Sequence, residues 1–216
     1  MTEDKKQFKL SDYKIPDEKF YSRKTLAVAK SMLGCYLRHE TEDGIFGGMI
    51  VEAEGYLSYD DPGCHAFRGE TRRNKAMFGP PGHAYTYFTY GNHWMFNIVT
   101  EKEGIGCAVL IRALEPVEGI EQMWERRPKA KKEKDLANGP GKLAAALGIG
   151  REQYGADLRK SKLRIYQPDP GTRRQLLRRY GGVVQTTRIG LTVGSELEYR
   201  FYLKEHPCVS VRERPV

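Results

Sequence analysis

The stretch GMIVEAEGYL, residues 48–57, has the composition of a core strand but carries two glutamates just before its end. Strand alternation divides its side chains between two faces: Met49, Val51 and Ala53 on one, and Ile50, Glu52 and Glu54 on the other. Two interpretations follow. Either the glutamates form the solvated side of an edge strand, or Glu54 stands at a strand end beside a loop, where a rigid scaffold often presents catalytic groups.

Short strands with hairpin spacing surround this stretch. The patterns predict strands at 35–40, 46–57, 84–90, 95–100, 107–116, 163–166, 197–203 and 208–211, and helices at 22–33, 117–127 and 142–149. Residues 1–15 are polar and are predicted to be disordered, which leaves 16–216 as a single domain. We therefore expect one compact α+β domain, with an antiparallel or mixed sheet, a protruding β-hairpin and peripheral helices.

Composition limits the class of protein. A hydrophobic content of 39% in 216 residues supports a folded core, and the net charge of +8 suits a polyanionic partner or merely keeps the chain soluble. The cysteines are scattered without zinc-ligand spacing, which favours buried, reduced thiols in an intracellular protein: Cys35, Cys64, Cys107 and Cys208. No apolar run predicts a secretion signal or a membrane span.

Arg112 lies in the middle of the apolar segment CAVLIRALEP, residues 107–116. A buried arginine in such a strand needs a counter-charge, which Glu52 or Glu54 could provide. The pair could belong to a functional site, but structural ion pairs of this kind also occur in cores away from any site.

The segment AYTYFTYGNHW, residues 84–94, gathers aromatic residues around a predicted hairpin tip. Core packing explains Tyr85. It explains Tyr90 less well, because Tyr90 precedes Gly91 where the turn should protrude, and exposed aromatic residues usually mark a surface that something covers.

Basic residues form three clusters. Residues 159–188 contain nine Lys or Arg and one acidic residue, and the other two clusters are 126–134 and the group Arg68, Arg72, Arg73 and Lys75. A solvated surface is the usual meaning of one cluster. Three clusters together with an aromatic hairpin favour contact with a phosphate backbone.

Several of these segments, in order, resemble one family. IVEAEGYL, CHAFRGETRRNKAMF, PGHAYTYFTYGNHWMFNIV, AVLIRALEP and NGPGKL are similar to motifs of the alkyladenine (3-methyladenine) DNA glycosylases, and the resemblance runs from about Phe20 to Val211. It implies an intracellular, monomeric base-excision repair enzyme of bacterial cytoplasm or a nucleus. Such an enzyme would flip damaged purines out of duplex DNA and hydrolyse the N-glycosidic bond without cofactor, metal or strand cleavage.

The resemblance also implies roles for individual residues. Glu54 would activate the attacking water, Asn97 would exclude guanine through its exocyclic amine, and Tyr90 would fill the space left by the flipped nucleotide. The base would stack among Tyr56, His65 and Tyr87. Five further positions would line the pocket edge or approach DNA: Arg112, Thr71, Arg73, Met77 and Lys142. Family members often have VETEAY where this chain has VEAEGY, and bulkier residues where it has Asn92 and His93.

The chemistry agrees with these assignments. Glycosidic cleavage develops positive charge at the sugar C1′, which a carboxylate can stabilise while it deprotonates a water. A cationic purine such as 3-methyladenine leaves without acid help, whereas neutral hypoxanthine or ethenoadenine needs a donor that the sequence does not identify. Two alternatives remain: a non-catalytic DNA- or RNA-binding domain, and a hydrolase of free nucleosides.

Overall fold

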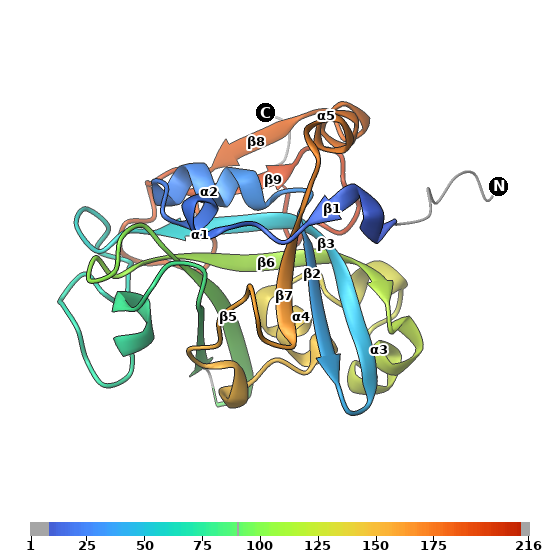
Figure 1. Cartoon of the computed structure of the whole chain (residues 1–216), viewed down its shortest axis with the longest axis horizontal. Helices are drawn as coiled ribbons and strands as arrows, with labels where there is room; N and C mark the ends of the chain where they lie inside the picture. The colour runs from blue at the N-terminus through green and yellow to red at the C-terminus, as the bar shows by residue number, and fades with distance from the viewer. Residues whose placement is uncertain (1–8, 90, 213–216) are drawn as a thin grey trace.

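An antiparallel sheet organises the chain in the computed structural model, which describes residues 9–89 and 91–212 (Figure 1). Within those residues the strand order is β1-β7-β2-β3-β6-β5-β4, with β9 paired to β3 and β8 to β9. The strands are β1 (Tyr13–Lys14), β2 (Tyr36–Thr41), β3 (Gly44–Tyr56), β4 (Ala84–Thr89), β5 (His93–Thr100), β6 (Cys107–Glu118), β7 (Leu163–Pro168), β8 (Val183–Thr186) and β9 (Arg200–Leu203). The predicted α+β fold is confirmed, and all of these pairings are antiparallel.

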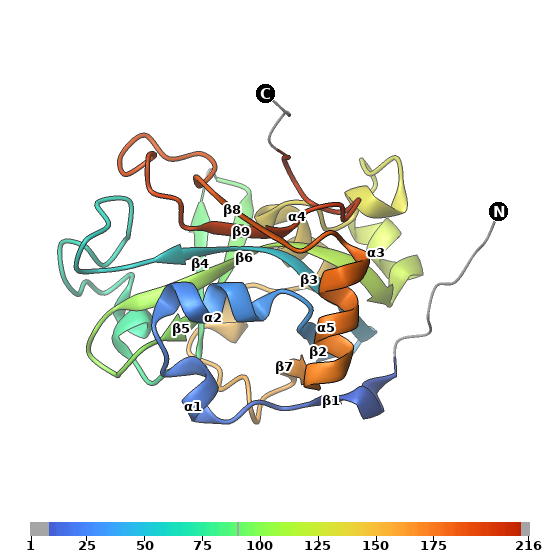
Figure 2. The same ribbon diagram turned by 90° about the horizontal axis from the view of Figure 1, so that it is seen from above.

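Helices cover both sides of the central strands. The α-helices are α1 (Glu18–Tyr21), α2 (Thr25–Met32), α3 (Ile120–Arg126), α4 (Pro140–Leu147) and α5 (Pro170–Arg179), and the 3-10 helices are η1 (Leu10–Asp12), η2 (Lys75–Phe78), η3 (Glu133–Asp135) and η4 (Arg151–Gln153). Helix α2 packs on β3 and β6 from one side, and α4 packs on β5 and β6 from the other (Figures 1 and 2). The main hydrophobic core lies between these layers.

Strand β3 is a central strand. It pairs with β6 along most of its length, with β2 along its first half and with β9 at Glu52–Glu54. Every residue from Phe46 to Gly55 is buried. The edge-strand interpretation of the glutamates is therefore wrong, because both of them lie in the interior of the sheet.

Two local features of β3 bring the glutamates into place. The register between β3 and β6 shifts on both sides of Glu52, which interrupts the simple alternation of faces expected for residues 49–54. Gly55 lets α2 approach, because a Cβ at this position would lie 2.6 Å from Cδ2 of Leu26. The glycine of the EGY sequence thus has a packing role.

Several expected boundaries differ from the structure. Ser22 ends α1, and the helix expected from residue 22 begins only at Thr25. Strand β6 continues through Pro116 to Glu118, because Pro116 pairs with Gly48 next to a register shift, where a missing N–H is tolerated.

Three segments differ in kind. Residues 208–211 do not form a strand, because Ser210 N and Val211 O bond to the side chains of Glu52 and Arg200 instead. The sequence did not predict helix α5. None of its residues is fully buried, so the segment lacks the broad apolar face by which a helix is recognised. Part of the N-terminal segment expected to be disordered, Leu10–Lys14, forms η1 and β1.

Candidate active site

Two loops and two strands meet at one end of the sheet. The loops that follow β3 and β8 lie at the same side of the molecule in both ribbon views, next to strands β4 and β5 (Figures 1 and 2). They enclose a cavity of about 60 Å³, which is lined by Tyr56, Gly63, His65, Met77, Tyr85, Tyr87, Asn97 and Leu191. The structure therefore brings together all four residues expected to form the base pocket.

The cavity walls are aromatic and mutually braced. The rings of His65 and Tyr87 meet edge to face at 4.6 Å, and those of Tyr85 and Tyr87 lie 5.4 Å apart. Nδ1 of His65 is hydrogen-bonded to the Tyr85 hydroxyl at 3.1 Å, and Nδ2 of Asn97 donates to the Tyr85 carbonyl at 3.0 Å. Tyr85, assigned to the core from the sequence, is buried but also lines the cavity.

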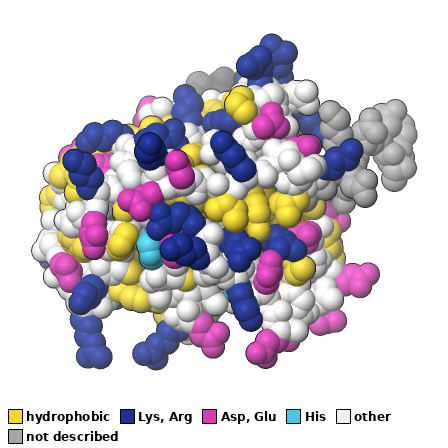
Figure 3. Space-filling model, in the orientation of Figure 1, with side chains coloured by type: hydrophobic (Ala, Val, Ile, Leu, Met, Phe, Trp, Pro, Cys, Tyr) yellow, Lys and Arg dark blue, Asp and Glu magenta, His cyan; other side chains and the backbone are white. Residues whose placement is uncertain are grey.

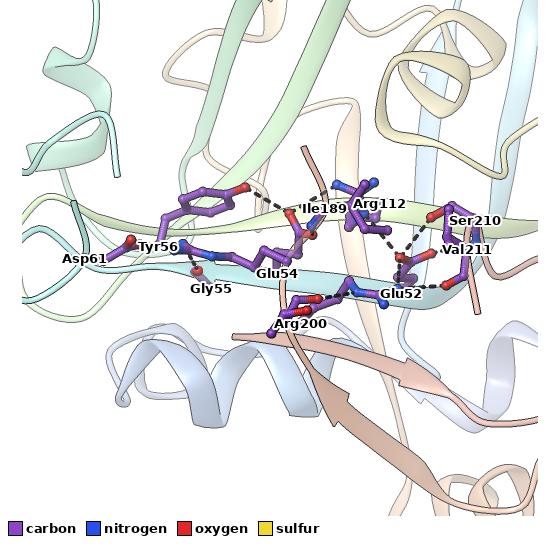
Figure 4. Close-up of polar contacts among 12 residues, drawn as sticks. Glu52, Glu54, Gly55, Tyr56, Asp61, Arg112, Ile189, Arg200, Ser210 and Val211 are labelled. Atoms are coloured by element: carbon purple, nitrogen blue, oxygen red, sulfur yellow. Dashed lines mark hydrogen bonds and ion pairs between the residues drawn. The ribbon is translucent and has the colours of Figure 1, made fainter. Parts of the chain in front are cut away.

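Glu54 lies directly behind Tyr56 and is fully buried. Its Oε2 accepts hydrogen bonds from the Tyr56 hydroxyl at 2.9 Å and from Nη1 of Arg112 at 3.2 Å (Figure 4). Its Oε1 accepts from the backbone amide of Ile189 at 2.9 Å. Among the described residues Oε1 has this single donor, so it keeps the capacity to accept a hydrogen bond from a water.

Arg112 joins the two glutamates. Its Nε donates to Oε1 of Glu52 at 3.2 Å while Nη1 reaches Glu54, so the predicted counter-charge is confirmed for both carboxylates. Glu52 also accepts from Nη1 of Arg200 at 3.0 Å and from the amide and hydroxyl of Ser210 (Figure 4). Two carboxylates and two guanidinium groups thus form a buried network without net charge, in which Glu52 is held entirely by the protein.

The protonation states suit these contacts. Burial alone would lower the pKa of Arg112, but Glu54 and Glu52 raise it above its ordinary value, so the guanidinium stays charged. Burial and the neighbouring Glu54 raise the pKa of Tyr56 well above its ordinary value, so its hydroxyl remains a donor to the carboxylate.

The remaining predicted residues occupy different places. Met77 lines the cavity, and the Arg73 guanidinium lies 5.6 Å from the Tyr87 ring centroid, at the cavity edge. Thr71 is hydrogen-bonded to Asn74 within the loop that precedes η2. Lys142 lies on α4, where it donates to Asn138, and is not among the lining residues. Tyr90 lies outside the described residues.

Several residues of the candidate site were not predicted from the sequence. Ile189 supplies its backbone amide, Leu191 lines the cavity, and Arg200 neutralises Glu52. A backbone donor leaves no signature in side-chain identity. Arg200 carries none either, because nothing in LEYRFYL shows that its register places it opposite Glu54 and beside Glu52.

The basic cluster at 159–188 is partly structural. Arg188 is fully buried against Asp61, Arg159 is paired with Asp157 and Glu18, and Arg173 caps backbone carbonyls. On the face shown in Figure 3, lysine and arginine side chains are spread out with acidic ones between them. On that face the clusters in the sequence do not form one continuous basic surface.

A larger cavity, about 550 Å³, lies elsewhere, beside the β2–β3 hairpin and η4. Its walls are open and carry charges of both signs, including Glu40, Glu152 and Lys162. It contains none of the predicted site residues. The smaller cavity is the better candidate because its walls are aromatic and one of them, Tyr56, is hydrogen-bonded to the buried carboxylate of Glu54.

The structure predicts that His65 is neutral in the folded protein at neutral pH. Burial, with a further contribution from Arg73, holds the pKa of His65 below its ordinary value of 6.5. Below that pH the unfolded chain gains a proton that the folded chain does not, so the free energy of unfolding should fall as pH falls.

Two measurements check this prediction. An NMR titration of the imidazole gives the pKa, and urea unfolding between about pH 8 and pH 5 gives the linkage, which should weaken in His65→Gln. An imidazole that titrates at or above its ordinary value would contradict it.

No helix in residues 9–89 and 91–212 is long and apolar enough to cross a membrane.

Comparison with known proteins identifies the family of this chain. Residues 19–207 match the model of a family described as methylpurine-DNA glycosylase (MPG). A relative from Carboxydothermus hydrogenoformans is 48% identical over 192 residues, which are 88% of this chain and 96% of that protein. One from Methanoculleus marisnigri is 48% identical over 193 residues, 89% and 97% of the two chains. Both carry the name "Putative 3-methyladenine DNA glycosylase". The chain therefore belongs to the methylpurine-DNA glycosylase family, and so to the DNA glycosylases of base-excision repair.

Proposed function

We propose that this protein flips alkylated or deaminated purines out of duplex DNA and hydrolyses their N-glycosidic bond with a water that Glu54 activates. The proposed substrates are 3-methyladenine, 7-methylguanine, hypoxanthine and ethenoadenine, and the product is an abasic site. One observation carries the proposal: the buried carboxylate of Glu54 is oriented by three donors, and one of them, Tyr56, is a wall of the aromatic cavity.

The cavity must widen to receive a base. At about 60 Å³ it is the size of roughly two water molecules. A flipped purine would separate the rings of Tyr56, Tyr87 and His65 and stack between them, which contributes about 1–3 kcal/mol per base. A cationic lesion gains more from such rings than a normal base does. Poorly paired lesions are also cheaper to flip, so selection begins before the pocket is reached.

Glu54 then acts on the water and on the developing charge. A water on Oε1 would face C1′ of the flipped nucleotide and lose its proton to the carboxylate as the base leaves. The Ile189 amide, Tyr56 and Arg112 hold the carboxylate in one orientation, so little reorganisation is needed during the reaction. The hydrolysis uses no amine nucleophile, so we propose that the DNA strand stays intact.

The direct test is incubation of the protein, expected to act as a monomer, with duplexes that contain hypoxanthine or ethenoadenine. Breaks should appear on a gel only after alkali, which cleaves abasic sites. Breaks without alkali would show lyase activity. Binding with no release would favour a non-catalytic binding domain, and release from free nucleosides that is insensitive to salt would favour a nucleoside hydrolase.

Asn97 is proposed to exclude guanine. Its side chain lines the cavity and is fixed by its bond to the Tyr85 carbonyl, so it occupies space that an exocyclic amine would need. Asn97→Ser shortens the side chain and should raise release of undamaged guanine by about tenfold, while hypoxanthine release changes little. Liquid chromatography of bases released from undamaged duplex measures this. An unchanged guanine rate would remove Asn97 from the discrimination.

A further inference from the structure

One buried ion pair connects the segments that form a wall of the cavity. Arg188 and Asp61 are both fully buried, and the two terminal nitrogens of Arg188 each donate to one carboxylate oxygen of Asp61. The same guanidinium donates to the carbonyl of Gly55 at 3.0 Å and to that of Gly194 at 3.3 Å. Arg188 therefore joins the end of β3 to the loops on both sides of the cavity.

Arg188 also contacts the groups that orient Glu54. Its guanidinium carbon lies 4.6 Å from the ring centroid of Tyr56, whose hydroxyl donates to Oε2 of Glu54 (Figure 4). The residue after it, Ile189, gives its amide to Oε1. Two of the three donors to Glu54 thus depend on where Arg188 is held.

We propose that Arg188, neutralised by Asp61, is a positioning residue for base release, which acts on the reaction through Tyr56 and the Ile189 amide. The inference rests on the proposed function. If the ion pair only joined two loops, apolar side chains could replace it without loss of stability, because burying two charges is costly. The planar fork of arginine supplies what such a replacement lacks: parallel bonds to a carboxylate and a flat surface against an aromatic ring.

Arg188→Lys tests this directly, because lysine keeps the charge opposite Asp61 but loses the fork and the flat surface. With enzyme in excess over an ethenoadenine duplex, the single-turnover rate of release should fall about 10- to 100-fold, as for a small misplacement of a reacting group. The rate of base capture is measured by the fluorescence change of ethenoadenine on mixing. This rate should change less than about threefold. Melting temperatures verify that each variant is folded.

Gly63→Ala displaces the same wall from the opposite side without removing any charge. A Cβ on Gly63 would lie 3.0 Å from Cδ1 of Leu191 and from the Val193 carbonyl, and 3.2 Å from Nη2 of Arg188. It should slow release more than it weakens capture, although Gly63 itself lines the cavity. Arg38→Lys is the matched control, because Arg38 is a half-buried arginine paired with Glu118 and Glu40 outside the cavity.

The outcomes separate this inference from the function beneath it. An inactive wild-type protein overturns both. An active wild type with a folded Arg188→Lys variant of unchanged rate overturns the positioning role alone, as does an equal loss of capture and release. If Arg188→Lys does not fold, Gly63→Ala decides: release slowed more than capture supports the role, and an unchanged rate overturns it.

Discussion

Replacing Glu54 by glutamine is expected to lower the single-turnover rate of base release by about a thousandfold or more while lesion-DNA binding is retained. The amide cannot take a proton from water, and it cannot stabilise the positive charge at C1′ as a carboxylate does. A thousandfold corresponds to about 4 kcal/mol of transition-state stabilisation. We expect binding to be retained because the proposed stacking surfaces lie on other residues, namely Tyr56, His65 and Tyr87, which line the cavity.

The measurement pairs a rate with an affinity on the same duplex. Release of hypoxanthine is followed by alkali treatment and gel separation, and affinity is followed by fluorescence anisotropy. Glutamine turns one acceptor oxygen of residue 54 into a donor, so one of its three bonds is lost, and the melting temperature must be recorded. Glu118→Gln serves as the control, because Glu118 pairs with Arg38 away from the cavity. A folded Glu54→Gln protein within tenfold of the wild-type rate would refute the proposed role.

Local patterns explain why much of the sheet could be predicted. The β2–β3 and β4–β5 hairpins follow from apolar runs separated by short turns, and such contacts are close in sequence. Helix α5 and strand β8 could not be predicted in the same way. Helix α5 carries arginines on most of its faces. Strand β8 pairs with β9, which itself attaches to β3 far away in sequence.

The site residues likewise fall into those that the sequence predicted and those that it did not. Motif similarity indicated Tyr56, His65, Tyr87 and Asn97, and the structure places all four on one cavity. The strand position of Glu54 suggested a catalytic group, but its orientation depends on partners from distant segments. The Ile189 amide is 135 residues away and Arg112 is 58 residues away. Neither contact has a local sequence pattern, so neither could be predicted without the three-dimensional structure.

Arg112→Met is expected to cause the largest loss of stability among these substitutions. Arg112 is the guanidinium that bridges Glu52 and Glu54, and both carboxylates are fully buried. Removing it leaves Glu54 without its ion-pair partner in the interior, and breaking a buried pair in this way costs about 3–5 kcal/mol. Glu52 is less affected, because Arg200 and Ser210 still bond to it. Urea unfolding at neutral pH measures the loss.

Two comparisons identify electrostatics as the cause. The deficit of Arg112→Met should shrink when Glu54→Gln is added, because the double variant no longer buries an unpaired carboxylate at residue 54. Arg38→Met removes an arginine whose partners, Glu118 and Glu40, are partly exposed to solvent, so it should cost less than Arg112→Met. If Arg112→Met cost as little as Arg38→Met, or if adding Glu54→Gln did not reduce its deficit, the ion pair between Arg112 and Glu54 would not account for the loss. Arg112 would then not be the group that compensates the buried carboxylate of Glu54.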